Sequence, residues 1–455
     1  MPKGFAALSQ EYGPFCYMRV INQDFVFVND LDLAREIFEN RGAIYSHRPR
    51  MVMMQEVIKR DTLLFMNYGS DFARIRKLVA TFLNSREAAK YWPAQEVESL
   101  KFVLAVQQAP QDALQLTRWT STSLIIRLLY GIEVRDKDDV LVCLAEDFAR
   151  ITFEATSVGG WLVNYIPILR HFPSWLPGAG FKRWAQHAQT RMDEFALVPY
   201  LTAKRNIAAG SIAPCWIVEK LLGASEPLTA QDEHDIRQTA TSLYSGGSDT
   251  ISATISSFIL LMLHHPHIQK KAQAEIDSVT GGEWVPGVRD RAQFPYVHCV
   301  VQELVRFAPA VPLVAHSLHV DDNVAGYDIP SGAWVMANIW TYTHDATRYP
   351  SPEVFAPERF MGGAPQEDPL GFVFGFGRRS CPGALLARAS VFLNVVHLLF
   401  AFDIVPAKDD AGMEVLPPLE WTDTFVAHPV PFVCDIRERS AGRIRLLEHA
   451  LDSLQ

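Results

Sequence analysis

The sequence predicts a mainly α-helical protein with small β-sheets, folded as one domain over residues 1–455. Hydrophobic residues make up 49% of the chain and charged residues 20%, which is typical of a large apolar core and excludes disordered and disulfide-scaffold proteins. Apolar residues recur at helical spacing from about residue 71 to about residue 280. No linker, charge run or repeat divides the chain.

Strand signals lie near the two ends of the sequence. Residues 15–28 are rich in aromatic and β-branched types and are broken by Asn22-Gln23-Asp24, which predicts a hairpin. Asp30 then begins a short helix. The helical part that follows is interrupted near residues 175–178. Late in the chain, Pro, Gly and Asp residues separate further short strands, expected at residues 311–320, 326–329, 334–339 and 424–436.

The charge balance and the cysteine content of the chain argue against several classes of function. Lys and Arg number 42 against 51 Asp and Glu, a net charge of −9, which provides no basic face for nucleic acid as the main partner. The six cysteines form no C-x-x-C pair, which argues against structural zinc and against a disulfide framework. His264, His265 and His267 flank Pro266, so a helix boundary is expected there instead of a metal site.

No segment has the length and apolarity expected of a membrane span or a signal peptide. The longest charge-free stretch, residues 250–269, carries several Ser, Thr and His residues together with Pro266. It is therefore expected to be a buried helix, and the chain is predicted to have no transmembrane segment.

The most specific motif spans residues 374–383, Phe-Gly-Phe-Gly-Arg-Arg-Ser-Cys-Pro-Gly, and fits F-x-x-G-x-R-x-C-x-G at every fixed position. A chance match in a chain of this length is on the order of 1 in 10⁴. The alternatives are weaker. Cys381 taken alone is an ordinary buried thiol, and a dinucleotide fingerprint fails because Ser380 stands where a third glycine is required.

With this motif the sequence resembles the cytochrome P450 family, the haem-thiolate monooxygenases. The resemblance implies the cytochrome P450 fold, a haem b cofactor, and Cys381 as the axial ligand of its iron. Phe374, Gly377 and Gly383 belong to the same loop. The two glycines are expected to let the loop approach the porphyrin, and peptide N–H groups at the start of the following helix are expected to stabilise the thiolate. Arg379 is expected to meet a haem propionate.

A second family motif predicts a structural charge network. Glu303 and Arg306 form E-x-x-R, whose spacing places both side chains on one helix face. Arg359, in a downstream Pro-Glu-Arg-Phe segment, resembles the third member of the network. Because buried charges are costly unless they are paired, the three residues are expected to stabilise the fold as one unit.

A third motif, Gly-Gly-Ser-Asp-Thr at residues 246–250, resembles the part of the family's central helix that borders dioxygen. Two glycines inside a helix cost about 1 kcal/mol each relative to Ala, which favours a functional reason for them. Asp249 and Thr250 are expected to organise proton delivery. The alternative is that the Thr250 hydroxyl bonds back to its own helix and that Asp249 is a solvated helix residue.

Other positions match the patterns of the family only in part. Arg76 corresponds to the second Arg of the family's W-R-x-x-R segment and is expected to contact a propionate. Phe72 and Ala73 stand at the Trp and first Arg positions, so an indole N–H bond to a propionate is excluded. Ile251 stands where Thr or Ser is usual. His316 resembles a residue that many fungal relatives place near a propionate.

The resemblance to the cytochrome P450 family covers nearly the whole chain. The sequence looks most like fungal microsomal members of the family, in residues 45–49 and 431–436 among others. Those members carry an N-terminal anchor, and this sequence begins beyond it. The resemblance therefore implies the cytosolic face of the endoplasmic reticulum membrane, with a soluble or peripheral form also open.

The function expected from the resemblance is insertion of one oxygen atom of O₂ into a lipophilic small molecule. A terpenoid or polyketide intermediate of secondary metabolism is expected first, and detoxification of aromatic compounds second. No nucleotide-binding motif occurs, so NADPH is expected to act only through NADPH-cytochrome P450 reductase, docked on Arg378, Arg379 and Arg388. Two alternatives stay open: a haem-thiolate isomerase or dehydratase working without reductase, and a non-enzymatic haem carrier or sensor.

Five segments are expected by the same resemblance to bound the substrate pocket: residues 51–66, 151–165, 243–247, 311–315 and 421–426. Their apolar side chains suit a lipophilic ligand, because burial contributes about 25 cal/mol per Å². The expected lining is Met51, Val52, Met53, Met54, Phe65, Met66, Phe153, Trp161, Leu243, Tyr244, Val311, Leu313, Val314, Trp421 and Phe425.

Overall fold

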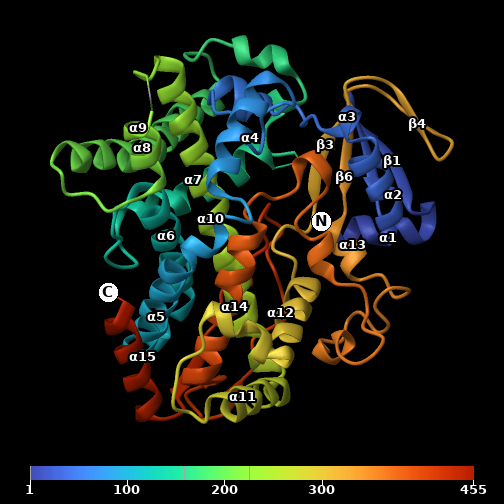
Figure 1. The fold of residues 1–455 in the computed structure, drawn as a ribbon. Coiled ribbons are helices and arrows are strands. Elements are labelled where there is room, and N and C mark those ends of the chain that lie inside the picture. The colour runs from blue at the N-terminus through green and yellow to red at the C-terminus, as the bar shows by residue number, and fades with distance from the viewer. Residues whose placement is uncertain (1, 158, 225, 455) are drawn as a thin grey trace.

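The computed structural model describes residues 2–157, 159–224 and 226–454. Helix α10 (Ala230–His264, 35 residues) runs through the middle of the helical part of the molecule (Figure 1). Thr229 caps its start, because the Thr229 hydroxyl accepts from the Asp232 N–H at 3.1 Å and the Asp232 carboxylate accepts from the Thr229 N–H at 2.9 Å. Residues 251–263 are all buried, which confirms the buried helix expected there, and the helix ends at His264 before Pro266 starts the next one.

Helices from both halves of the chain contact α10, among them α4, α6, α7, α8 and α14. In chain order the α-helices are α1 (Pro2–Tyr12), α2 (Leu31–Arg35), α3 (Gly42–Tyr45), α4 (Ser70–Phe82), α5 (Trp92–Gln108), α6 (Ala113–Tyr130), α7 (Val140–Thr156), α8 (Gly180–Ala208), α9 (Trp216–Leu222), α10, α11 (Pro266–Thr280), α12 (Pro295–Phe307), α13 (Ile339–Thr343), α14 (Ala384–Ala401) and α15 (Ala441–Leu454). The short π and 3₁₀ helices are η1 (Glu36–Asn40), η2 (Val52–Val57), η3 (Ala88–Tyr91), η4 (Pro110–Asp112), η5 (Leu162–Asn164), η6 (Pro167–His171), η7 (Val288–Gln293), η8 (Pro357–Phe360), η9 (Pro369–Gly371) and η10 (Gly377–Arg379).

The predicted interruption of the helical part lies between α7 and α8. Residues 159–179 form turns together with η5 and η6, so the break around 175–178 is confirmed and extends further than predicted. Pro167, Pro173 and Pro177 fall within it, and proline removes a backbone donor and blocks a continuous helix.

A four-stranded sheet joins the N-terminus to the late strands in the order β1-β2-β6-β3. Its strands are β1 (Phe15–Val20), β2 (Gln23–Val28), β3 (Val314–Ser317) and β6 (Trp334–Ala337). The predicted hairpin is confirmed, but Gln23 and Asp24 belong to β2 and the turn is formed by residues 21 and 22. Asp24 is held in the strand because its carboxylate accepts from Tyr17 and Arg19 of β1.

Two smaller sheets complete the β-structure: β4 (Asp322–Val324) with β5 (Tyr327–Ile329), and β8 (Glu414–Val415), β7 (Phe402–Lys408) and β9 (Cys434–Glu438). The strand expected over residues 424–436 was wrong for most of its length, because only its last residues belong to β9. Pro429 and Pro431 lie in the part that is not strand, and proline cannot donate to a sheet. Strand β7 follows α14 without a break, so no turn signal marked it in the sequence.

Two helices, α10 and α14, are long and apolar enough to cross a membrane by length and composition. In each, 78% of the relevant window is buried inside the protein. Core helices of water-soluble domains have the same property, so length and apolarity are weak evidence for a membrane span in these two.

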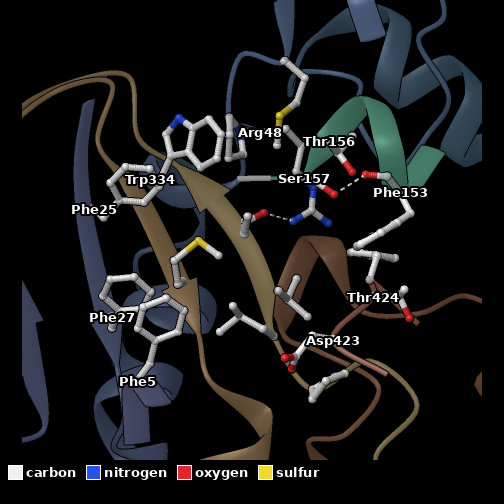
Figure 2. A pocket seen from close by; sticks show the side chains of 18 of the residues that line it. Phe5, Phe25, Phe27, Arg48, Phe153, Thr156, Ser157, Trp334, Asp423 and Thr424 are labelled. Atoms are coloured by element: carbon white, nitrogen blue, oxygen red, sulfur yellow. Dashed lines mark hydrogen bonds between the residues drawn. The ribbon is translucent and has the colours of Figure 1, made fainter. Parts of the chain in front are cut away.

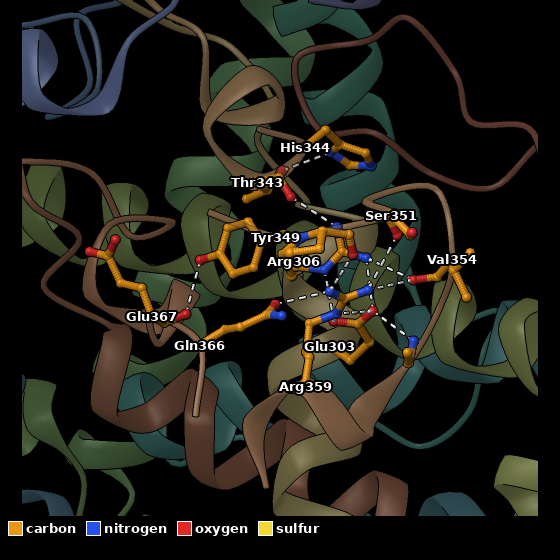
Figure 3. A network of polar contacts seen from close by, with 12 residues as sticks. Glu303, Arg306, Thr343, His344, Tyr349, Ser351, Val354, Arg359, Gln366 and Glu367 are labelled. Atoms are coloured by element: carbon orange, nitrogen blue, oxygen red, sulfur yellow. Dashed lines mark hydrogen bonds and ion pairs between the residues drawn. The ribbon is translucent and has the colours of Figure 1, made fainter. Parts of the chain in front are cut away.

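The expected charge network forms between α12 and η8 (Figure 3). Glu303 and Arg306 are fully buried, and the Arg306 Nε and Nη2 atoms donate to the two Glu303 carboxylate oxygens at 2.7 and 2.8 Å. Arg359 approaches the same carboxylate to 3.1 Å with its side chain 5% exposed. The Ala356 N–H adds a further bond to that carboxylate at 2.8 Å.

The remaining arginine donors in this network bond to backbone carbonyls and to one side-chain amide, because Arg359 Nη1 donates to Gln366 Oε1 at 2.9 Å. Arg306 Nη1 donates to Thr343 O at 2.9 Å, and Arg359 Nη2 donates to Val354 O at 2.9 Å. The network therefore joins α12 to the segment from α13 to η8, which lies on the chain just before the Cys381 loop. Glu303, Arg306 and Arg359 therefore form one paired unit, and their role in stabilising the fold stays a prediction.

Replacing Glu303 with Ala is expected to lower the free energy of unfolding by about 3–5 kcal/mol, because it leaves two arginines buried without their carboxylate. The measurement is denaturant unfolding of the purified holoenzyme. Lys90→Ala is the matched control, since Lys90 forms an exposed i, i+3 pair with Glu87 and its loss should change stability little. Equal stability of the Glu303 and Lys90 variants would contradict the structural role.

Candidate active site

Cys381 lies in the loop between η10 and α14. Its N–H donates to the Phe374 carbonyl at 2.7 Å, which closes the loop over the motif residues. Gly383 is the N-cap of α14, and its peptide N–H bonds the Cys381 thiol. The expected support of the sulfur by N–H groups at the helix start is therefore present at Gly383.

The Cys381 side chain lies deep in the protein and is still accessible. Burial raises the pKa of its thiol, while the Gly383 N–H and the charge of Arg76 act in the opposite direction. Yet Cys381 is among the solvent-accessible cysteines of the chain. Cys381 is thus surrounded by protein and yet accessible, which is the position required of a ligand to a buried cofactor.

The two loop glycines serve different purposes. Gly377 has φ +47°, and a Cβ there would stand 2.6 Å from the Phe38 carbonyl oxygen of η1. Glycine at 377 is therefore needed for packing against η1, which differs from the porphyrin approach that we expected. At Gly383 a Cβ would stand 3.8 Å from the Cys381 sulfur, an ordinary contact.

The glycine pair of α10 also divides into two roles. A Cβ on Gly247 would meet Ile125 of α6 at 3.1 Å, so this glycine allows close helix packing. A Cβ on Gly246 would meet nothing within 4 Å, so the helix is open on that side. The Thr250 hydroxyl donates to the Gly246 carbonyl at 2.9 Å, as the alternative interpretation of Thr250 anticipated. Its oxygen lone pairs remain able to accept a bond.

Asp249 is held by two side chains that sequence analysis did not identify. His428 Nε2 donates to the Asp249 carboxylate at 2.8 Å, and Arg118 Nη1 lies 3.9 Å from it. Arg118 lies 3.6 Å from the Glu146 carboxylate in turn. Asp249 is therefore part of an ion-pair chain and is not the solvated residue of the alternative interpretation. A lone histidine 179 residues away along the chain carries no sequence signal for this contact.

Arg379 is buried under the Cys381 loop. Its guanidinium donates to the carbonyls of Ser46 at 2.7 Å and Met66 at 2.6 Å, and it lies 3.9 Å from the centre of the Phe72 ring. Phe72, at the family's Trp position, therefore stacks on the arginine. Burial and the charges of nearby arginines lower the Arg379 pKa to about 9.

Arg76 lies close to Cys381, since its Nη2 atom donates to the Ser380 carbonyl at 2.6 Å. Burial lowers its pKa as well. Arg48 lies near Arg379, and burial lowers the Arg48 pKa to about 10. The three guanidiniums remain cationic at neutral pH and donate mainly to carbonyls. A dianionic group fits this donor set, so these residues and the Cys381 sulfur match a haem with its two propionates.

His316, which we expected near a propionate, is held by a backbone carbonyl. It lies on β3, 3% exposed, and its Nδ1 atom lies 2.9 Å from the Tyr45 carbonyl. Burial holds the pKa of His316 well below its usual range, and Arg48 and Arg379 add to the effect. A carbonyl only accepts, so Nδ1 carries the proton in this bond. The expected contact of His316 with a propionate stays a prediction.

The expected docking face retains two of its three arginines. Arg378 is exposed and donates to the Tyr68 hydroxyl at 3.0 Å, and the Arg388 side chain is 31% exposed. Arg379 is buried and cannot contribute to a surface contact. The physical reason is that its guanidinium is turned inward to the carbonyls of residues 46–66.

An apolar cavity of about 160 Å³ lies between the four-stranded sheet, α7 and the 423–425 turn (Figure 2). Of the expected lining, Met51, Phe65, Phe153, Leu313, Val314 and Phe425 line it. The turn of η2 buries Val52, Met53 and Met54 in the core instead, and Tyr244 stacks on Phe195. Met66, Trp161, Leu243, Val311 and Trp421 are likewise not among its lining residues in the described part of the chain.

Sequence analysis missed the part of the lining that α1 and the sheet supply: Phe5 from α1, and Met18, Val20, Phe25, Phe27, Trp334 and Met336 from the sheet. Parallel pairing of β2 with β6 places Phe25 opposite Trp334. That pairing joins segments about 300 residues apart, so no local pattern indicated it. Arg48 was missed because it lies just before the 51–66 segment.

Comparison with known proteins supports the assignment of the Cys381 loop to a haem-binding protein. Residues 1–434 match the family model for cytochrome P450. Cytochrome P450 monooxygenase claR of Ampulloclitocybe clavipes is 37% identical over 96% of this chain and 82% of its own length. Cytochrome P450 monooxygenase 176 of Postia placenta is 35% identical over 98% of this chain and 88% of its own.

Solved structures show the same fold. A zebrafish cytochrome P450 with progesterone superposes with a TM-score of 0.76 at 23% identity, covering 96% of this chain and 99% of that chain. The mainly α fold with small sheets is therefore the cytochrome P450 fold. From the Cys381 loop, the family model and the fungal relatives together, we conclude that this chain belongs to the cytochrome P450 family and is a monooxygenase of that family.

Proposed function

We propose that this enzyme inserts one oxygen atom of O₂ into a lipophilic small molecule, with haem b held by Cys381 and electrons delivered by NADPH-cytochrome P450 reductase. The observation that carries the proposal is the Cys381 sulfur, which is deep in the protein, accessible and bonded by the Gly383 N–H. A haem with an axial thiolate supplies the electron density that favours O–O cleavage.

The chain's own residues have separate tasks in this proposal. Cys381 ligates the iron, and Arg76 and Arg379 neutralise the propionates. Their low pKa values reflect buried positive charge, which an anionic group would stabilise. Phe374 holds the Cys381 N–H through its carbonyl and so fixes the sulfur's position.

Proton delivery is assigned to Thr250, Asp249 and His428. Thr250 presents its oxygen beside the open face of Gly246. Asp249, the next residue on α10, accepts a hydrogen bond from His428 on the C-terminal turn. The turn itself is fixed, because Thr422 and His428 exchange hydrogen bonds at 2.8 and 3.1 Å. His428 is therefore a positioning residue that acts through Asp249.

The apolar cavity supports a lipophilic substrate. A terpenoid or polyketide intermediate of secondary metabolism is the first candidate, and detoxification of aromatic compounds the second. The paired Asp249 and Thr250 favour oxygen insertion over a reductase-independent isomerase or dehydratase, since rearrangement of an oxidised substrate needs no proton delivery to O₂. They also favour an enzyme over a haem carrier or sensor.

Two exposed apolar segments are the basis for proposing that the enzyme lies at the cytosolic face of the endoplasmic reticulum membrane. Ile168 and Trp175, between α7 and α8, are 71% and 79% exposed. Tyr17 and Ile21 of the first hairpin are each 56% exposed. Met18 and Val20, next to Tyr17 and Ile21 on the hairpin, line the cavity, so a lipophilic substrate would enter from the side of the hairpin that contacts lipid.

Cys381→Ser is expected to abolish the red-shifted Soret band of the reduced CO complex, because a hydroxyl cannot replace the thiolate. Cys143→Ser, a change at an exposed cysteine of α7, is the matched control and should keep the band.

Wild-type enzyme with reductase, NADPH and ¹⁸O₂ should place one labelled oxygen in a product from a panel of terpenoid, polyketide and aromatic compounds. Cys381→Ser should give no such product. Product formed without NADPH would favour the isomerase, and a retained band in the Ser variant would mean that another residue ligates the iron.

Thr250→Ala is expected to keep haem and substrate binding and to divert electrons into hydrogen peroxide. A positioned proton donor contributes about 10²–10⁴-fold, so product per NADPH should fall roughly tenfold or more. Thr241→Ala is the matched control, because Thr241 makes the same kind of bond, to the Arg237 carbonyl at 2.8 Å on the same helix. Unchanged coupling in the Thr250 variant would remove its catalytic role.

His428→Ala is expected to raise peroxide formation several-fold at unchanged haem content, because Asp249 loses its closest donor. His428→Gln should restore much of the coupling, since its amide N–H can take the place of Nε2–H. Peroxide and product are measured per NADPH consumed. Equal coupling in the Ala and Gln variants would assign His428 no part in proton delivery.

A further inference from the structure

Aromatic side chains form one wall of the apolar cavity: Phe5 of α1, Phe25 and Phe27 of β2, and Trp334 of β6. Figure 2 shows these rings in a row beside the strands. Phe27 stacks on Phe5 and on Phe25, with ring centres 3.9 and 6.4 Å apart. Trp334 meets Phe25 edge-on at 5.0 Å, and the parallel pairing of β2 with β6 fixes these two residues opposite each other. The wall is therefore a continuous aromatic surface held by the sheet.

Other rings of the lining have no aromatic partner. Phe65, Phe153 of α7 and Phe425 of the C-terminal turn line the same cavity. None of the three forms a ring pair with another aromatic side chain within residues 2–157, 159–224 and 226–454. Aromatic rings attract one another edge-on or offset-stacked at centre distances of about 4.5–7 Å. A ring bound in the cavity would give these side chains the partner that the described chain does not supply.

The volume of the cavity fits one such ring. It measures about 160 Å³, and an apolar cavity of about 150 Å³ is large enough to bind one benzene molecule. A flexible aliphatic chain of the same carbon content loses conformational freedom at each of its rotatable bonds when it is bound, whereas a ring does not. Ring contacts and rigidity therefore favour the same kind of ligand.

We propose that this cavity binds one aromatic ring of the substrate and that Trp334 and Phe25 are the residues that select it. This inference rests on the proposed function and narrows its substrate class to compounds that carry a benzene-sized ring. The two residues belong to the sheet and have no assigned part in haem binding or proton delivery. Their replacement therefore changes which molecule binds without removing the chemistry.

The test compares three alcohols of ten carbons on the holoenzyme: 4-phenyl-1-butanol, 4-cyclohexyl-1-butanol and 1-decanol. Binding is measured by calorimetry and by the low-to-high-spin Soret shift. Burial of apolar area alone favours the two aliphatic alcohols, since both are at least as apolar as the phenyl compound. Wild-type enzyme should instead bind the phenyl compound roughly fivefold tighter than the cyclohexyl compound, because the second cannot make ring–ring contacts.

Trp334→Leu should bring the affinities for the phenyl and cyclohexyl alcohols within about twofold of each other, and Trp334→Phe should keep the preference. Phe25→Leu carries the same test if Trp334→Leu yields no holoenzyme. Val20→Ala is the matched control. Val20 lines the same cavity from β1 and has no ring, so its truncation should weaken the binding of both alcohols alike.

Equal or weaker binding of the phenyl compound by the wild type, or a preference that survives in both Leu variants, would overturn the inference. Calorimetry reports binding without turnover and so separates the inference from the proposed function. A Trp334-dependent ring preference without any oxygenated product would support the ring site and reject the proposed function. Oxygenated aliphatic products without any ring preference would support the proposed function and overturn the inference.

Discussion

Uncompensated positive charge around an internal space is the constraint on which the candidate site depends. Arg379 is buried and Arg48 and Arg76 are half-buried; all three donate to carbonyls, and their pKa values are all lowered. A folded chain tolerates such charge only where an anion compensates it. The Cys381 sulfur shares this environment, because the charge of Arg76 favours its thiolate form. In the proposed function, ligation of the iron and neutralisation of the propionates are two results of one electrostatic arrangement.

Helix α10 connects that arrangement to the rest of the molecule. Its N-terminal half is open at Gly246, and its C-terminal half is buried in the core. Asp249 lies between them and is bonded by His428, which comes from the last part of the chain. The same C-terminal turn contributes Phe425 to the cavity. One short turn therefore holds both a lining residue of the cavity and the partner of Asp249 against one helix.

The sequence was sufficient to predict those parts of the site whose residues lie close together along the chain. The Cys381 loop, the E-x-x-R pair and the glycines of α10 lie within a few residues of each other, and the structure places them as elements of the expected kind. The contacts that sequence did not indicate are long-range ones. His428 meets Asp249 across 179 residues, and β2 pairs with β6 across about 300. The packing of Gly377 against the Phe38 carbonyl is another long-range contact that the sequence did not indicate.

A crystal structure of the purified, haem-loaded enzyme is the most direct measurement of the central claim, that buried arginines and Cys381 together hold a dianionic haem. The account predicts Cys381 sulfur on the iron, with the guanidiniums of Arg76 and Arg379 within hydrogen-bond distance of the propionates. Propionates bonded only to neutral groups or exposed to solvent, with those two arginines still turned to backbone carbonyls, would contradict it.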